Sequence, residues 1–329
     1  MARCRIPLPL VAILVAAVAW AGCGGGDEDG TDPGAPPPPA SASDFPKPGS
    51  RTIADLRREL GPGPVLSPAV LVLQPGERNR FGFGLFDRAR KQISQAQVAL
   101  YVADRRGRNV RGPYLSKWHS LAVDTEFQSE SVTADPDAAK SYYTAELPFE
   151  RAGDYQVIAL VKLDGRLVAS DPIGVQVRDD WKVPDVGDPA PRTETPTLED
   201  VGGVESKIDT RVPPAPDLHE HDFADVVGKR PVLLVFATPA LCQSRVCGPV
   251  VDVLKQVKAG HEGDAAFIHM EIYNDNEVER GFRPQVREWG LPTEPWAFAI
   301  DRTGRVAARL EGAFGVDELE RALRAAAGG

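Results

Sequence analysis

Short apolar stretches alternate with turn signals in the first large part of the chain. Between Gly61 and about Asp180 the stretches are AVLVLQ, NRFGFGLF, QVALYVAD, YYTAELPF, AGDYQVIALVKL and RLVASDPIGVQVR. Turn residues such as Pro75-Gly76 and Asp164-Gly165 separate them. Evenly spaced short strands with such turns are typical of an antiparallel β-sandwich. We therefore predict an all-β sandwich over residues 61–180.

The pattern changes to alternating strands and helices over residues 217–329. PVLLVFAT and AAFIHMEIY are continuous apolar runs, which indicate strands buried on both faces. GPVVDVLKQVKAG has helical spacing and ends at Gly260. EVERGFRPQVREWG is helical but is interrupted by Pro284, PWAFAIDRTGRVAARLEG predicts a hairpin, and VDELERALRAAAGG predicts a closing helix. The order β-α-β-α-β-β-α predicts a second, α/β domain.

The remaining segments are predicted to be an export signal, a tether and a linker rather than folded domains. Arg3 and Arg5 precede the apolar run IPLPLVAILVAAVAW, which is too short for a comfortable membrane span. Small residues follow it, so residues 1–22 are expected to be an export signal. Residues 23–60 are expected to be a flexible tether that contains one short helix, RTIADLRREL. Residues 181–216 are Pro-rich and acidic and are expected to be an interdomain linker.

The net charge and the positions of the cysteines limit the classes of function that the chain can have. The formal net charge of -9 argues against a nucleic-acid partner, which would need basic surface. Ala21-Gly22-Cys23 resembles the lipobox of bacterial lipoproteins, which implies that Cys23 carries lipid and anchors the chain to the extracytoplasmic face of the cell membrane. A plain secretory signal remains the alternative. With Cys4 removed in the signal and Cys23 lipidated, Cys242 and Cys247 are the remaining thiols. Outside the cytosol we expect them to be oxidised at least part of the time.

Both domains resemble known families. AGDYQVIALV resembles a late strand of immunoglobulin-like domains. PVLLVFATPALC, WGLPTEPWAFAIDRTGRV and the terminal helix resemble the thioredoxin-like domain of redoxins. We therefore expect a multidomain chain with an immunoglobulin-like sandwich followed by a thioredoxin-like fold. The second resemblance implies that Pro295 is a cis-proline whose loop lies against the cysteines and offers backbone to a substrate peptide.

The cysteine pair carries the expected chemistry. A thiolate is the nucleophile in disulfide exchange, and a helix N-terminus lowers the pKa of a thiol. We expect Cys242 to lie at such a terminus and to be the nucleophile, Cys247 to resolve, and Arg245 to add positive charge beside Cys242. The C-x-x-x-x-C spacing spans about 7.5 Å along a helix, too far for a disulfide. Either Cys242 precedes the helix, or the first turn unwinds; a helix starting near Pro249 would leave both cysteines in a loop.

Two carboxyl groups are candidate partners of the thiols. Glu271 shares one face of AAFIHMEIY with His269, and a buried Glu271 with a raised pKa could accept a proton. Glu294 precedes Pro295, so it should lie close to the cysteines. Its charge would raise the pKa of the thiols and oppose Arg245. A structural role in the core or at the rim is the alternative for each of these residues.

These features favour a thiol-disulfide oxidoreductase that needs no cofactor. Its partners would be protein thiols and disulfides or an upstream membrane reductant. One alternative is a thiol peroxidase, because peroxiredoxins of the bacterioferritin-comigratory type also use C-x-x-x-x-C and a Thr-Pro before the first cysteine. Here Thr238-Pro239 lies one residue too far away. A second alternative is a non-enzymatic envelope module with a structural disulfide. A third is copper or zinc binding by His219 and His221 with the two cysteines, and we expect no metal.

Overall fold

The computed structural model describes residues 36–242 and 244–328. These described residues all belong to one compact unit. The predicted export signal and Cys23, the predicted lipidation site, lie outside the described residues. Among the described residues, no helix has the length and apolar character needed to cross a membrane.

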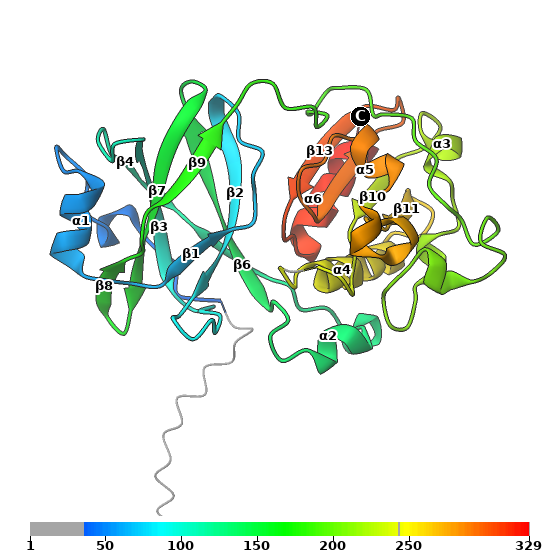
Figure 1. Cartoon of the computed structure of the whole chain (residues 1–329), viewed down its shortest axis with the longest axis horizontal. Coiled ribbons are helices and arrows are strands. Elements are labelled where there is room, and N and C mark those ends of the chain that lie inside the picture. Colours follow the sequence, from blue (N-terminus) through cyan, green and yellow to red (C-terminus); the bar gives the residue numbers. More distant parts are fainter. Residues whose placement is uncertain (1–35, 243, 329) are drawn as a thin grey trace, which may run out of the picture. The chain divides into compact units, whose positions relative to one another are not determined.

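Two antiparallel sheets make up the first half (Figure 1). One has the order β1 (Val65–Pro68), β2 (Gly76–Phe86), β6 (Ser141–Phe149) and β5 (Lys117–Ser120). The other has the order β4 (Arg111–Leu115), β3 (Gln97–Asp104), β7 (Gly153–Leu163) and β8 (Arg166–Ala169), and β9 (Ile173–Val177) also pairs with β7. Alternate residues of β2, β3, β6 and β7 form one apolar core between the sheets, as strand alternation requires.

The segment before the sandwich is folded onto it, which differs from the flexible tether predicted for residues 23–60. Helix α1 (Ile53–Leu60) begins with a capping box between Thr52 and Asp55. Its Ile53 and Leu56 are buried with Phe45 against the outer face of β3 and β7. A few well-placed apolar side chains are enough to dock this segment, although its composition is rich in Pro and Ser.

The second half contains a four-stranded sheet with helices on both faces. Its order is β11 (Ala266–Met270), β10 (Val232–Phe236), β12 (Trp296–Ile300) and β13 (Val306–Glu311), with β10 and β11 parallel and the other pairs antiparallel. Helices α4 (Cys247–Gly260) and α6 (Val316–Ala327) cover one face. Helices α3 (Phe223–Val226) and α5 (Pro284–Glu288) pack on the other. The predicted β-α-β-α-β-β-α order is therefore confirmed, and it is the order of a thioredoxin-like fold.

The predicted linker also belongs to this domain. Gly187 N donates to Val306 O at 2.8 Å, and Val306 N donates to Asp188 O at 2.9 Å, so this segment lies along β13. Val183, Asp209 and Ala215 are buried. This packing differs from the interdomain linker predicted for residues 181–216, because irregular, Pro-rich chain can pack closely without forming a helix or strand.

The stretch AVLVLQ, predicted as a strand, is irregular apart from one bridge between Leu73 and Val177. Its backbone finds a different partner. Leu71 N and Val72 N donate to the two carboxylate oxygens of Glu311 in β13, at 2.8 and 3.0 Å. The carboxylate accepts the two hydrogen bonds that carbonyl groups of a neighbouring strand would otherwise accept.

Candidate active site

The two cysteines are joined in a disulfide, with their Cα atoms 5.9 Å apart. Cys247 is the first residue of α4 and is wholly buried. Cys242 lies in the loop before the helix and is partly exposed. Of the alternatives left open by the spacing, the first is therefore the case: Cys242 precedes the helix. The expectation that Cys242 occupies the helix N-terminus is wrong, because Cys247 is there. The positive end of the helix dipole would stabilise a thiolate on Cys247.

The two sulfur atoms differ in access. Cys242 Sγ lies 3.1 Å from Ser244 Oγ in the exposed part of the loop, whereas Cys247 is packed among the apolar residues under α4. An incoming thiolate must approach the sulfur along the S–S axis and displace the other one. Only Cys242 offers an accessible sulfur, so Cys247 is the leaving group in such an attack.

Glu294 lies beside both cysteines. One of its carboxylate oxygens and the two Sγ atoms lie within 4.8 Å of one another. The peptide bond between Glu294 and Pro295 is cis, at the position that the resemblance assigns to a cis-proline. Tyr273 Oη donates to Glu294 Oε1 at 3.3 Å, and Oε2 has no hydrogen-bond partner among the described residues. Burial raises the pKa of Glu294 to about 7, and the negative charge of Glu271 adds to this rise.

Glu271 lies deeper, just after β11. It is 1% exposed, and its Oε1 accepts from Thr210 N at 2.7 Å. Its Oε2 has no hydrogen-bond partner among the described residues. Burial raises the pKa of Glu271 above its ordinary value. Among the described residues no hydrogen bond joins it to either sulfur, and its negative charge raises the pKa of Glu294.

Arg245 does not supply a free positive charge to Cys242. Its guanidinium Nη1 forms ion pairs with Asp135 at 3.1 Å and with Asp137 at 2.7 Å. Both carboxylates come from the segment between β5 and β6, which reaches the cysteine loop. Arg245 has a φ of 57°, an uncommon backbone conformation for a side chain of this size. Its positive charge is therefore compensated, contrary to expectation.

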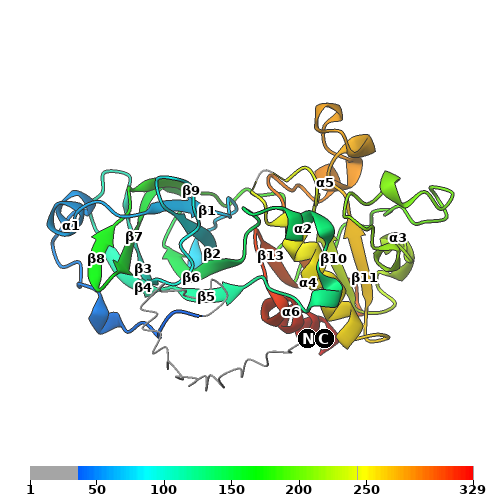
Figure 2. The same cartoon turned by 90° about the horizontal axis from the view of Figure 1, so that it is seen from below.

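Sequence reasoning missed this segment between β5 and β6. It contains α2 (Glu130–Ala134), which lies beside α4 (Figures 1 and 2). Ala139 N donates to Arg245 O at 3.3 Å, and Ser129 N donates to Asp252 Oδ2 in α4 at 2.9 Å. Arg211 pairs with the same Asp252 at 2.8 Å, in the interior. The only signal was its polar, irregular composition, which is also that of an ordinary loop.

The histidines are arranged differently from the metal alternative. His219 is buried beside Asp209 and His269, and among the described residues no contact joins it to His221 or to the cysteines. His269 Nε2 lies 3.0 Å from Ala237 O, at the start of the cysteine loop. The combination of His219, His221 and the two cysteines is therefore not a site.

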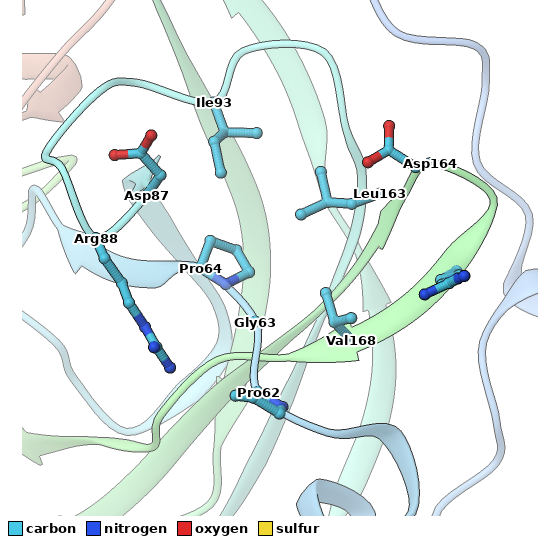
Figure 3. Close-up of a pocket in the computed structure, with 10 residues that line it drawn as sticks. Pro62, Gly63, Pro64, Asp87, Arg88, Ile93, Leu163, Asp164 and Val168 are labelled. Atoms are coloured by element: carbon cyan, nitrogen blue, oxygen red, sulfur yellow. The ribbon is translucent and has the colours of Figure 1, made fainter.

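A surface hollow of about 600 Å³ lies elsewhere, in the sandwich half (Figure 3). Its polar side chains are charged and its other residues are apolar, glycine or proline; the lining comprises Pro62, Gly63, Pro64, Asp87, Arg88, Ile93, Leu163, Asp164, Arg166 and Val168. It contains no thiol, hydroxyl or imidazole group. The cysteine pair, and not this hollow, is the candidate active site.

Two of the solved structures most similar to this chain are thiol:disulfide interchange proteins of Chlorobium tepidum. The first, assigned as DsbE, shares 20% identity over 44% of this chain and 99% of its own, with a TM-score of 0.32. The second, of the thioredoxin family, shares 16% identity over 42% and 95%, with a TM-score of 0.30. The Lin-41 filamin domain shares 14% identity over 32% and 81%, with a TM-score of 0.18. No protein-family model and no curated protein matches the chain.

Proposed function

We propose that this protein is a thiol-disulfide oxidoreductase anchored by Cys23 lipid to the extracytoplasmic face of the cell membrane. One observation carries the redox assignment: a partly exposed Cys242 is bonded to a buried Cys247 at a helix N-terminus, with the carboxyl group of Glu294 beside both sulfurs. The Pro295 loop is the surface proposed to receive the substrate peptide. Protein thiols, protein disulfides or an upstream membrane reductant are the proposed partners.

The exchange proceeds in two displacements. A substrate thiolate attacks Cys242 Sγ, the Cys242–Cys247 bond breaks, and the electron pair leaves on Cys247 Sγ. The protonated form of Glu294, about half of the population at pH 7, gives its proton to this thiolate, and the helix terminus stabilises any charge that remains. A second substrate thiolate then attacks the substrate sulfur of the mixed disulfide and releases Cys242 as a thiolate, which takes up a proton. The substrate loses two electrons and the cysteine pair gains them; the reverse sequence reduces a substrate.

The reduction potential of the pair tests this proposal. We would equilibrate the protein in thiol redox buffers, alkylate the free thiols and measure the oxidised fraction. A working oxidoreductase has a potential between about -120 and -270 mV. A value below about -300 mV is typical of a structural disulfide and would overturn the proposal in favour of a non-enzymatic module.

Single-cysteine variants test the assigned roles. Cys242→Ser should reduce exchange with a dithiol substrate to background, because Cys247 is inaccessible. Cys247→Ser should accumulate mixed disulfides, because the resolving thiol is lost. Ser244→Ala, which removes a neighbouring hydroxyl and keeps both cysteines, is the matched control and should remain active. Continued exchange by Cys242→Ser would contradict the assignment.

A peroxidase would be recognised by rapid oxidation of the reduced protein by hydrogen peroxide. The buried position of Thr238 disfavours this function, because its side chain is wholly buried and cannot meet peroxide at the partly exposed Cys242. We therefore expect reduced protein to react with peroxide no faster than a simple dithiol of similar thiol pKa.

A further inference from the structure

Three potential metal ligands meet in the interior of the second half. Asp209 comes from the segment before β10, His219 follows the 3₁₀ turn Pro216–Leu218, and His269 lies in β11. Their exposed fractions are 1%, 2% and 1%. His219 Nε2 lies 3.6 Å from Asp209 Oδ2, and His269 Nδ1 lies 3.7 Å from Asp209 Oδ1. One ligand atom of each residue lies within 4.8 Å of those of the other two.

The hydrogen bonds determine which way the lone pairs point. A carbonyl oxygen only accepts, so His269 Nε2, 3.0 Å from Ala237 O, must carry a proton. In the neutral ring the lone pair is then on Nδ1, which faces the carboxylate of Asp209. Two acceptors face each other across this gap. His269 Nδ1 and both ring nitrogens of His219 are buried without a hydrogen-bond partner among the described residues. Such atoms are expensive to bury, and a cation between them would satisfy them together.

The surroundings of the three residues match those of metal ligands. Ligating histidines usually donate their other N–H to a carbonyl or carboxylate, and ligating carboxylates are themselves hydrogen-bonded. His269 donates to Ala237 O in this way. Asp209 Oδ1 accepts from Arg211 N at 2.8 Å, and Asp209 Oδ2 accepts from Ala215 N at 2.7 Å. The guanidinium of Arg211 is paired with Asp252 at 2.8 Å, so its positive charge is compensated.

We propose that Asp209, His219 and His269 bind a divalent first-row transition metal ion of the Zn²⁺ class. Two imidazole nitrogens and one carboxylate oxygen are a donor set that suits such an ion, with water as the fourth ligand. Bonds of about 2.1 Å in a tetrahedral site place neighbouring ligand atoms about 3.4 Å apart. The three ligand atoms lie within 4.8 Å of one another, so binding would draw them together by at most about 1.4 Å. The ion would fasten the segment around Asp209 and His219 to β11, under the loop that carries Cys242. This proposal is independent of the redox function.

Metal titration of the intact chain tests the proposal. The Cys242→Ser/Cys247→Ser double variant removes the thiols of the cysteine pair, and a chelator removes bound metal before Zn²⁺ or Co²⁺ is added. We expect one ion per chain, a higher melting temperature with Zn²⁺, and a Co²⁺ spectrum with the visible bands of a tetrahedral site and no thiolate charge-transfer band. Failure of the folded double variant to bind Zn²⁺ stoichiometrically would overturn the proposal.

Ligand variants then identify the site. In the same background, His219→Gln should weaken Zn²⁺ binding at least about 100-fold. His221→Gln, two residues away and outside the cluster, is the matched control and should leave affinity unchanged. His269→Gln is the second ligand variant; if it does not fold, the Co²⁺ spectrum and His219→Gln decide. Equal affinity in His219→Gln and the control would show that any bound ion lies elsewhere, and would contradict the proposal.

Discussion

Glu294 is the residue whose carboxyl group lies beside both sulfurs of the cysteine pair. Burial raises its pKa to about 7, so it is largely neutral below that pH and charged above it. The same shift affects stability. A carboxyl group whose pKa is raised by folding contributes stability that is complete below its ordinary pKa of 4.5 and is lost as the pH rises through about 7. The proton that Glu294 would give up in the proposed exchange therefore also contributes to the stability of the folded chain.

Replacing Glu294 by Gln should make the reduced thiols ionise at lower pH, because it removes a negative charge beside both sulfurs. A change of one pKa unit corresponds to a tenfold change in thiolate population, and we expect Cys242 to be alkylated about 3- to 10-fold faster at pH 7–8. The measurement is the rate of alkylation against pH. Glu279→Gln, at an exposed carboxylate, is the control. An unchanged profile in Glu294→Gln would show that the carboxyl group does not act on the thiols.

The sequence identified the residues of the site more readily than their surroundings. Cys242, Cys247, Glu294 and Pro295 could be placed together because they belong to two short motifs whose spacing is local. Asp209 could not, because its partners His219 and His269 come from different elements and meet only in the folded chain. The charge on Arg245 was misjudged for the same reason, since its two carboxylate partners lie more than 100 positions earlier.

At the scale of elements, α1 shows how a short helix is held in a segment that composition describes as flexible. Thr52 Oγ1 accepts from Asp55 N at 3.2 Å, and Asp55 Oδ2 accepts from Thr52 N at 3.0 Å. An isolated helix of eight residues would be marginal in water. Its cap and its buried face are therefore both needed. The sequence predicted a short helix over RTIADLRREL, but not that the irregular chain before it is also packed.

Thr52→Ala should destabilise the protein by about 1 kcal/mol, because it removes an N-cap acceptor without changing the buried face of α1. Urea unfolding at neutral pH measures this loss. Arg58→Ala, which removes an exposed side chain of the same helix, should change the free energy of unfolding by less than about 0.5 kcal/mol. The reduction potential of the cysteine pair should be the same in both variants. Equal stability of Thr52→Ala and wild type would show that α1 does not depend on its cap.

At the scale of the whole molecule, charged contacts join residues of the two halves. Arg80 in β2 pairs with Glu318 in α6 at 2.7 Å, with exposed side-chain fractions of 17% and 9%. Tyr142 Oη donates to the same carboxylate and accepts from Gly315 N. Although burial opposes ionisation, Arg80 and its neighbours lower the pKa of Glu318 to about 2. The sequence could predict the two folds separately, but not this contact, because isolated charges in a strand and a helix look like ordinary surface residues.

Acid should weaken this contact. A carboxyl group whose pKa is lowered by folding contributes stability above its ordinary pKa of 4.5, and this is lost as the pH falls toward about 2. Glu318→Gln should therefore reduce the free energy of unfolding at pH 7 by on the order of 3 kcal/mol, and the difference from wild type should shrink between pH 4.5 and 2. Urea unfolding across this range measures it. Glu320→Gln, on the same helix, is the control. A pH-independent difference would indicate lost packing rather than lost charge.

The bonds from Leu71 and Val72 to Glu311 have a consequence for the order in which the protein is made. Glu311 follows Leu71 by 240 positions. At about 5–20 residues per second, that distance takes about 10–50 s to synthesise. The sandwich half precedes Glu311 on the ribosome, yet its irregular edge obtains this hydrogen-bond acceptor only after β13 of the second half has been synthesised. The irregular edge of the sandwich therefore completes its hydrogen bonds only after the second half has supplied Glu311.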